Sequence, residues 1–462
     1  MVFDASANIV CHAVAEIDTQ TTGQLMVEHD AEQLIDSVYR VIDQVHKSLG
    51  KGYKNIAQAG MATQRSSIVC WDKLNGEALS PVISWQDRRT AGRLDYAASQ
   101  DDLIHQLTGL YLNPHYGASK IKWCLENNAA VQKSLNTNSL CIAPMASYIL
   151  FRLLDERPFV TDPANASRTL LMNYKTLKWE KTLLDLFSVP DTILPKITYT
   201  QSAFGNIVRH SHSIPLLLCT GDQSAVIYSQ GELADSDVFI NAGTGAFIQK
   251  PDQNIPELKQ EKLLASVVYA DRKKTKYVIE GTVNGAGRAL QWFAQQSKIS
   301  DYEKSLNQWC KAYANPPVFF NAISGIGSPY WIADHESYFL SEASNEEKFV
   351  AIVESIIFLI VDNIRCMQII SSDIRQIKLA GGLANIPAFC QKLSDLSNCQ
   401  VLPAKETEAT AKGVFFLLSQ LPALNLEEAY SATFHPQNDE MLFNRYHIWR
   451  KLMLDSFQGQ RI

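Results

Sequence analysis

Two apolar segments, each followed directly by a short polar turn, constrain most strongly what this chain can fold into. The first, 216–223, is Leu-Leu-Leu-Cys-Thr-Gly-Asp-Gln, and the second, 240–245, is Ile-Asn-Ala-Gly-Thr-Gly. Each predicts a β-strand ending in a turn, where Asp222 presents a carboxylate and Gly243 and Thr244 present backbone amides and a hydroxyl. Phosphoryl transfer to an alcohol requires such groups, a carboxylate that accepts a proton and amides that cradle a phosphate. Taken alone, each motif also occurs in ordinary turns.

Length and composition bound the class of protein. With 462 residues the chain exceeds what one hydrophobic core normally supports, so we expect two domains. A net charge of −6 with interspersed signs argues against nucleic-acid and membrane-surface partners. The nine cysteines are scattered without a CxxC pair, which is typical of a reducing compartment rather than of disulfides or a metal site. A signal-peptide pattern is absent and the longest apolar run, 356–361, is short, so we expect a cytoplasmic protein.

The first half of the chain alternates between strand-like and helical patterns. Residues 1–3 and 9–15 predict a hairpin. A helix is expected to begin at Asp30, with Gln33 as its capping-box partner, and to end at Gly50. Such alternation favours an α/β class with mixed sheets.

The second half continues the pattern. Residues 238–241 and 246–250 flank the Gly-Thr-Gly turn and predict a hairpin around it. Ser344 and Glu347 predict a capping box in front of a long helix, and 376–380 predicts a strand that breaks at two glycines.

Several segments, in one consistent order, resemble those of the FGGY family of carbohydrate kinases, and within it the glycerol-kinase branch. They are 62–65 with 71–73, 84–90, 161–169, 221–223, 243–245, 325–331 and 381–382. This resemblance implies an α/β, two-domain actin-like ATPase (ribonuclease H-like) fold with mixed sheets and a central cleft that holds the active site. It implies a substrate-binding and catalytic-base domain over 1–228 and a nucleotide-binding domain over 229–462.

The resemblance also implies roles for residues that bind the substrate. Asp222 matches the general base, and Gln223 matches a further ligand of a substrate hydroxyl. Arg65 matches a polyol-binding residue, whose planar fork suits two adjacent hydroxyls. Trp85 and Phe247 match an aromatic wall for the carbon face of the polyol. The alternatives are a helix-capping turn residue for Asp222, a surface arginine for Arg65, and ordinary core residues for the two aromatics.

On the nucleotide side, the resemblance implies ATP with Mg²⁺, without assigning a metal ligand to this chain. Gly287 would allow a helix to approach the adenosine closely. Gly382 follows a strand and opens a helix, so its amide could meet a phosphate. The spacing at Asn385 differs from the family pattern by about one residue. The expected nucleotide contacts are Gly243, Thr244, Gly287, Gln291, Gly382 and Asn385.

Two departures from the family pattern bear on activity. Family members open with a strand and an Asp-x-Gly-Thr phosphate loop before the strand that corresponds to 1–3. We therefore expect an incomplete phosphate clamp, and losing even one such donor costs roughly 3 kcal/mol. Ser66 stands where glycerol kinases carry an acid, and His115 stands where they carry a polyol-binding tyrosine. Glycerol itself is therefore not the expected substrate.

The leading hypothesis is an ATP-dependent kinase of a small polyol or sugar. The alternative is a catalytically impaired or non-catalytic polyol- or nucleotide-binding relative, and a start upstream of Met1 is a third reading. A homodimer or a homotetramer remains open.

Overall fold

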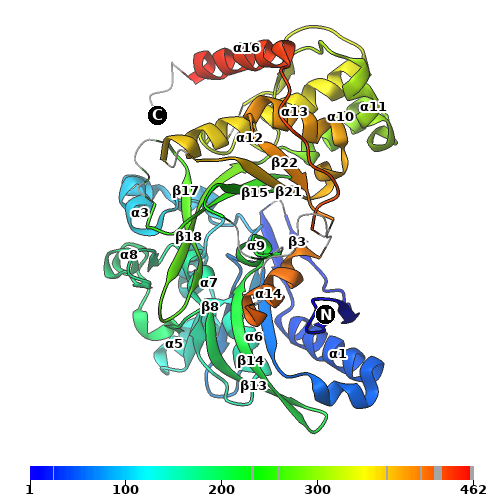
Figure 1. Ribbon diagram of the computed structural model, residues 1–462. Helices are drawn as coiled ribbons and strands as arrows, with labels where there is room; N and C mark the ends of the chain where they lie inside the picture. The colour runs from blue at the N-terminus through cyan, green and yellow to red at the C-terminus, as the bar shows by residue number, and fades with distance from the viewer. Residues whose placement is uncertain are drawn as a thin grey trace. The chain divides into compact units, whose positions relative to one another are not determined.

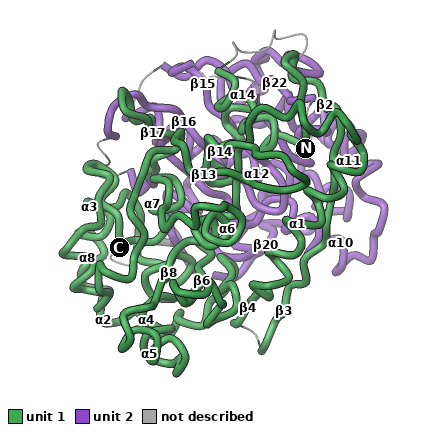
Figure 2. The backbone as a smooth tube through the Cα atoms, turned by 90° about the horizontal axis from the view of Figure 1, so that it is seen from below, with its two compact units in different colours: residues 1–232, 265–277, 408–423 green, residues 233–264, 278–407, 424–462 purple. Residues whose placement is uncertain are grey.

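The computed structural model describes residues 1–23, 25–229, 231, 234–256, 258, 261–333, 335–370, 373–405, 408–420 and 429–457. The chain divides into two compact units (Figure 2). The first holds residues 1–232, 265–277 and 408–423, and the second holds residues 233–264, 278–407 and 424–462. Each unit combines sheets with helices, so the predicted α/β class is confirmed (Figure 1). The domain boundary near residue 228 stays a prediction.

The first unit contains a five-stranded sheet in the order β3-β4-β7-β6-β8 and a three-stranded sheet in the order β13-β14-β5. Its strands are β1 (Val2–Phe3), β2 (Ile9–Cys11), β3 (Gln20–Thr22), β4 (Met26–His29), β5 (Ala59–Thr63), β6 (Ile68–Asp72), β7 (Val82–Ile83), β8 (Leu140–Pro144), β9 (Val160–Thr161), β10 (Met172–Asn173), β11 (Lys178–Trp179), β12 (Lys196–Ile197), β13 (Gln201–Arg209) and β14 (His212–Gly221). Its helices are α1 (Ala31–Leu49), α2 (Asp95–Ala98), α3 (Asp101–Thr108), α4 (Gly117–Asn127), α5 (Ala129–Asn136), α6 (Met145–Leu153), α7 (Pro163–Ser167), α8 (Lys181–Phe187), α9 (Asp222–Val226) and α14 (Ala409–Ser419), with short 3₁₀ helices η1 (Gly50–Asn55), η2 (Ala91–Arg93) and η3 (Asp191–Ile193).

Helix α1 begins and ends where the sequence predicts. The Asp30 side chain accepts a hydrogen bond from the Gln33 amide at 2.9 Å, and Gly50 follows the last turn with φ 52°. The reciprocal half of the predicted capping box is wrong, because the Gln33 side chain bonds Asp18 instead. Its Oε1 accepts from the Asp18 amide at 2.9 Å, and its Nε2 donates to the Asp18 carboxylate at 2.7 Å. A tertiary contact has therefore replaced the local one.

The two strands that carry the candidate site residues of the first unit lie side by side. Strand β5 pairs in parallel with β14, and Thr63 is opposite Gly221. The carboxyl ends of both strands therefore meet at one edge of the sheet. Helix α14 belongs to this unit although it comes late in the chain, and it packs against α9 beside β14 (Figure 1). A Cβ on Gly413 would lie 1.9 Å from the Ala225 carbonyl oxygen, so only glycine allows this crossing.

The second unit has a sheet in which β18, β16, β15, β21 and β22 follow one another. Residues 265–277, which hold most of the hairpin of β17 and β18, belong to the first unit. The strands of this unit are β15 (Asp237–Ala242), β16 (Ala246–Asp252), β18 (Thr275–Val283, from Val278 onward), β19 (Phe319–Phe320), β20 (Tyr338–Phe339), β21 (Gln376–Ala380) and β22 (Gln400–Pro403). Strand β17 (Leu264–Ala270) belongs to the first unit from Ala265 onward. The helices are α10 (Gly287–Ser297), α11 (Tyr302–Ala312), α12 (Asn345–Ile370), α13 (Pro387–Ser397) and α16 (Glu440–Phe457), with the 3₁₀ helix η4 (Gly382–Asn385).

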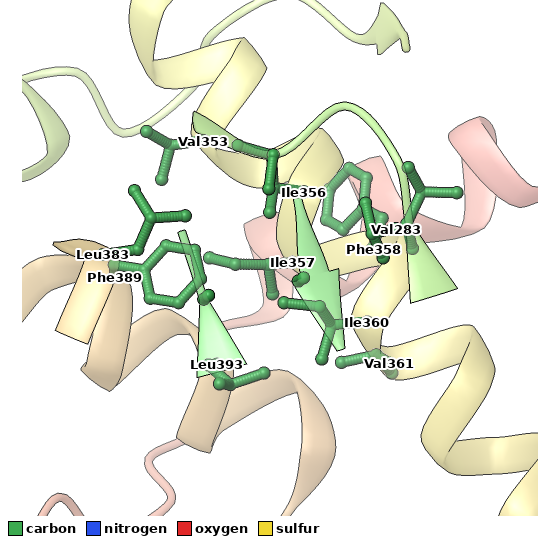
Figure 3. Packing of buried hydrophobic residues seen from close by; sticks show 14 of the residues in the cluster. Val283, Val353, Ile356, Ile357, Phe358, Ile360, Val361, Leu383, Phe389 and Leu393 are labelled. Carbon is green, nitrogen blue, oxygen red and sulfur yellow. The ribbon is translucent and has the colours of Figure 1, made fainter. Parts of the chain in front are cut away.

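Helix α12 forms the centre of the second unit's core. Its predicted capping box is confirmed, because Ser344 Oγ accepts from the Glu347 amide and the Glu347 carboxylate accepts from the Ser344 amide. Ile357 of α12 packs with Phe389 and Leu393 of α13 in a continuous apolar cluster (Figure 3). Within the described part of the chain, neither this helix nor any other is long and apolar enough to cross a membrane.

Candidate functional site

Arg65 and Asp222 meet at the shared edge of β5 and β14. The Arg65 Nε lies 3.9 Å from Asp222 Oδ1. The aliphatic stem of Arg65 lies against Gly221, where a Cβ would be 2.5 Å from both Cγ and Cδ. Burial raises the pKa of Asp222, and the positive charges of Arg65 and Arg168 partly oppose this shift. The result is a carboxylate that binds a proton more readily than usual beside a fixed cation.

Asp222 is the first residue of α9, and its side chain makes a strictly local bond there. Its Oδ1 accepts from the Gln223 amide at 2.7 Å, while Gly221 occupies the cap position without a side chain to cap the helix. Gln223 Oε1, Thr220 Oγ1 and Ser224 Oγ are buried and have no hydrogen-bond partner among the residues that the structure describes. Buried polar atoms are nearly always satisfied, so these atoms mark unused bonding capacity around Asp222.

Trp85 and His115 form an aromatic surface in the same unit. The two rings are 5.6 Å apart and inclined by 65°. Burial, together with the positive charges of Lys120 and Arg168, lowers the pKa of His115 well below its usual value. The ring is therefore neutral near pH 7, so one nitrogen can donate a hydrogen bond and the other can accept one. Trp85 is 38% exposed, so it is not a core residue.

Lys120 is a residue that the sequence interpretation missed. This completely buried ammonium group donates to the carbonyl oxygens of Ser66 at 3.1 Å, Ser84 at 2.8 Å and His115 at 2.7 Å. The sequence signal is its position on α4, where it shares the buried face with Cys124. A lysine on an apolar helix face is unusual, because lysine is rarely buried without a partner.

The segment 161–169 supports the same edge of the sheet. Asp162 caps α7 and accepts from Asn165 Nδ2 at 2.6 Å, and Asn165 Oδ1 accepts from Thr63 Oγ1 at 3.4 Å. Burial raises the pKa of Asp162 to about 6. Arg168, whose charge acts on both Asp222 and His115, donates to Ser266 Oγ at 2.7 Å. The motif therefore connects β5 to a second cation, which the sequence interpretation also missed.

The Gly-Thr-Gly turn of the second unit lies at another edge of parallel strands. Strands β15 and β21 run parallel, so the turn after β15 lies beside Gly381 and Gly382. A Cβ on Gly381 would be 2.4 Å from the Ala242 carbonyl oxygen, which requires glycine there. By contrast, a Cβ on Gly243 or Gly382 would meet nothing within 4 Å. Open space at the carboxyl ends of parallel strands is where α/β sheets bind ligands.

Helix α10 is anchored to this turn. The Gly287 amide donates to the Gly243 carbonyl at 2.9 Å, and the Arg288 amide donates to the Thr244 carbonyl at 3.0 Å. A Cβ on Gly287 would lie 2.7 Å from the Gly243 oxygen, so this glycine permits the approach of α10 to the turn. Gln291 lies one turn further along α10 and is exposed.

The structure thus gathers the predicted residues into two groups. In the first unit these are Arg65, Ser66, Trp85, His115, Asp222 and Gln223. In the second unit they are Gly243, Thr244, Phe247, Gly287, Gln291, Gly382 and Asn385. Phe247 is 38% exposed and so is not a core residue, and Asn385 ends η4 with an exposed side chain. No cluster of three or more His, Cys, Asp or Glu side chains suited to a metal ion occurs among the described residues.

Solved structures share the fold. A Plasmodium falciparum glycerol kinase with ADP matches with a TM-score of 0.89 at 24% identity, covering 98% of this chain and 94% of that one. A xylulose kinase from Brucella ovis matches with a TM-score of 0.87 at 18% identity, covering 99% and 96%. The chain therefore has the two-domain α/β fold of the sugar kinases, the actin-like ATPase type that the sequence predicts.

Family models and a curated relative agree with that fold. Residues 1–227 match the N-terminal domain, and residues 238–419 the C-terminal domain, of the FGGY family of carbohydrate kinases. A glycerol kinase from Mycoplasma pneumoniae is 33% identical over 438 residues, which is 90% of this chain and 85% of that protein. The chain belongs to the FGGY family of carbohydrate kinases, phosphotransferases that act on hydroxyl groups.

Proposed function

We propose that this protein transfers the γ-phosphoryl group of ATP to a hydroxyl of a small polyol or sugar, with Asp222 as the general base. The observation that carries the proposal is the pairing of this carboxylate with Arg65 at the ends of two parallel strands. Burial raises the pKa of Asp222, which increases its affinity for the proton of an alcohol. The similarity to a glycerol kinase supports the choice of a polyol.

In this mechanism Asp222 accepts the proton of the substrate hydroxyl while the hydroxyl oxygen attacks the γ-phosphorus. The new bond joins that oxygen to phosphorus, and the bond between phosphorus and the bridging oxygen of ADP breaks. Arg65 orients the adjacent hydroxyls with its planar fork. Trp85 packs against the carbon face of the substrate, and the neutral ring of His115 offers both a donor and an acceptor.

The turn at Gly243 and Thr244, together with Gly382, receives the phosphates of ATP. The open space at both glycines supports this assignment, because phosphate must approach backbone amides closely. Mg²⁺ would enter with ATP and neutralise charge on the phosphates, since such sites commonly hold Mg²⁺ through the substrate phosphates and only one or two carboxylates. Gln291, on the helix whose start bonds the Gly243 turn, and Asn385, at the end of η4, contact the remainder of the nucleotide.

The altered polyol contacts favour a substrate other than glycerol. Ser66 has a smaller side chain than the acid of glycerol kinases, and its buried Oγ has no partner among the described residues. His115 replaces a phenol with a ring that can also accept a hydrogen bond. A larger polyol or a ketose therefore suits this site.

The test is ADP release with ATP, Mg²⁺ and glycerol, erythritol, ribulose or xylulose, followed by mass spectrometry of the product. We expect turnover, with erythritol or a ketose preferred over glycerol. A preference for glycerol would contradict the substrate assignment. Binding of ATP and polyol without ADP release would instead identify the non-catalytic relative.

A further inference from the structure

Lys120 joins three segments that are far apart in the sequence. Its three hydrogen bonds reach carbonyl groups of the segment after β5, the segment after β7 and the segment before α4. An ammonium group has three N–H donors and no acceptor, so these three bonds use its entire capacity. The side chain is completely buried, so water does not compete for the carbonyl groups.

Each of these carbonyl groups belongs to, or directly follows or precedes, a residue of the proposed substrate site. Ser66 follows Arg65 in the chain, and its backbone has a φ of 65°, an unusual value for a residue other than glycine. Ser84 precedes Trp85, and the third carbonyl is that of His115 itself. The position of the Lys120 ammonium nitrogen therefore fixes the backbone at or next to three substrate-binding residues, Arg65, Trp85 and His115.

Helix α4 holds this nitrogen in place. The amides of Gly117 and Ala118 donate to the carbonyls of Arg168 and Thr169 at 3.1 and 2.7 Å. A Cβ on Gly117 would lie 3.1 Å from the Thr169 Cα, so the start of the helix is tightly docked. The helix that carries Lys120 is thus fixed to the segment that contributes Arg168.

The charged groups that face Lys120 leave its ammonium without a dedicated carboxylate. Among the described residues, Asp87 is the one acidic group that acts on it, while Arg88 and Arg89 act in the opposite sense. Asp87 is itself bound by Arg89, at 2.9 Å from Nε and 2.8 Å from Nη2. The remaining neighbour is His115, whose protonation the Lys120 charge opposes.

We propose that Lys120 is a positioning residue for the substrate, which sets the relative placement of Arg65, Trp85 and His115 through backbone carbonyls. The proposal rests on the function proposed above. It predicts that replacing Lys120 weakens binding of the polyol and leaves binding of the nucleotide unchanged. The reason is that all three segments bonded to Lys120 carry residues assigned to the polyol.

The test compares Lys120→Met with Lys122→Met. Lys122 lies on the same helix but pairs with Glu126 at 3.0 Å on the outer side, so its replacement is a matched control. We expect kcat/KM for the polyol to fall on the order of 10²-fold in Lys120→Met, with a higher KM for the polyol, because a misplacement of about 1 Å costs this much in rate. The KM for ATP should not change, and Lys122→Met should behave as the native chain. Equal increases in both KM values, or no increase in either, would show that Lys120 has only a structural role.

Two further measurements do not depend on turnover by the variant. Burial lowers the pKa of Lys120 to about 7, so in the native chain the KM for the polyol should rise as the pH increases through that value. A KM for the polyol that falls across that range would contradict the proposal. The pKa of His115, followed by NMR, should rise in Lys120→Met and stay unchanged in Lys122→Met, because the Lys120 charge opposes protonation of the ring. An unchanged value in both variants would contradict the placement of that charge beside His115. Absence of turnover in the native chain with every substrate would refute the proposed function, while the His115 titration would still test Lys120.

Discussion

Adding one methyl group at Gly221 tests whether the position of Arg65 matters for the reaction. The backbone of Gly221, with φ −85° and ψ 151°, is one that alanine adopts without strain. The new Cβ would lie 2.5 Å from Cγ and Cδ of Arg65, whereas carbon atoms in contact are about 3.5–4.0 Å apart. The arginine stem must therefore move by about 1 Å or more, away from its present place beside Asp222.

We expect Gly221→Ala to lower kcat/KM for the polyol on the order of 10²-fold. This corresponds to about 2.7 kcal/mol of transition-state stabilisation. Overpacking alone should cost about 1–3 kcal/mol of stability, so the folded protein should remain measurable. A coupled assay of ADP release and a thermal melt provide the two quantities.

Gly92→Ala is the matched control. Gly92 has the same φ of −85°, and a Cβ there would meet nothing within 4 Å. This variant should retain native kcat/KM and melting temperature. Native kcat/KM in Gly221→Ala as well would refute the reasoning, because it would mean that displacing Arg65 has no effect on the reaction.

Three further predictions concern other parts of the molecule. Glu354→Gln should lower the free energy of unfolding in denaturant by about 3–5 kcal/mol, because Lys392 and Arg445, at 2.8 and 2.6 Å from this buried carboxylate, would lose their counter-charge. The control is Asp301→Asn, which removes an exposed partner of Lys304. An equally small loss of stability in both variants would contradict this prediction. Because burial raises the pKa of Asp162 to about 6 in the folded chain, its protonated form stabilises the native state by about 3 kcal/mol below pH 3.8, and this stabilisation should be lost as the pH rises to about 6. The free energy of unfolding, measured across that pH range, should show this decline in the native chain but not in Asp162→Asn. The same slope in both proteins would refute the prediction. Thr244→Val should raise the KM for ATP by roughly tenfold or more, because it removes a hydroxyl that donates to a charged phosphate, and the KM for the polyol should not change. Equal KM values for ATP in the variant and the native chain would exclude a contact between Thr244 and the phosphate.

Local sequence patterns predicted the elements whose ends are stabilised by neighbouring residues. The capping pair Ser344 and Glu347 did mark the start of α12. At Asp30 the start of the helix was equally clear, but Gln33 bonds Asp18, which a local pattern cannot reveal because the partner comes from a preceding segment. Local rules therefore located helix ends better than side-chain partners.

The arrangement around Asp222 depends on contacts that are distant in the sequence. The parallel pairing of β5 with β14 brings Arg65 to Asp222, and no periodicity in either segment specifies that pairing. Lys120 was missed for a related reason, since a lysine in a helix is normally assumed to face solvent. Its three carbonyl partners come from separate segments and become apparent only in the folded chain.

Asp222→Asn tests most directly whether Asp222 removes the proton of the substrate hydroxyl. The amide keeps the size of the side chain and an oxygen that can accept from the Gln223 amide, but it cannot take up a proton. Because burial raises the pKa of Asp222, ionisation of this carboxylate is less favourable in the folded chain than in the unfolded chain, so the melting temperature of Asp222→Asn near neutral pH should be equal or higher.

The measurement is kcat for ADP release with the best substrate of the panel. We predict that Asp222→Asn lowers kcat by about 10²–10⁴-fold with the KM for ATP unchanged. Asp185→Asn, which alters an exposed carboxylate paired with Lys181, should keep native turnover. Native turnover in Asp222→Asn would contradict the account.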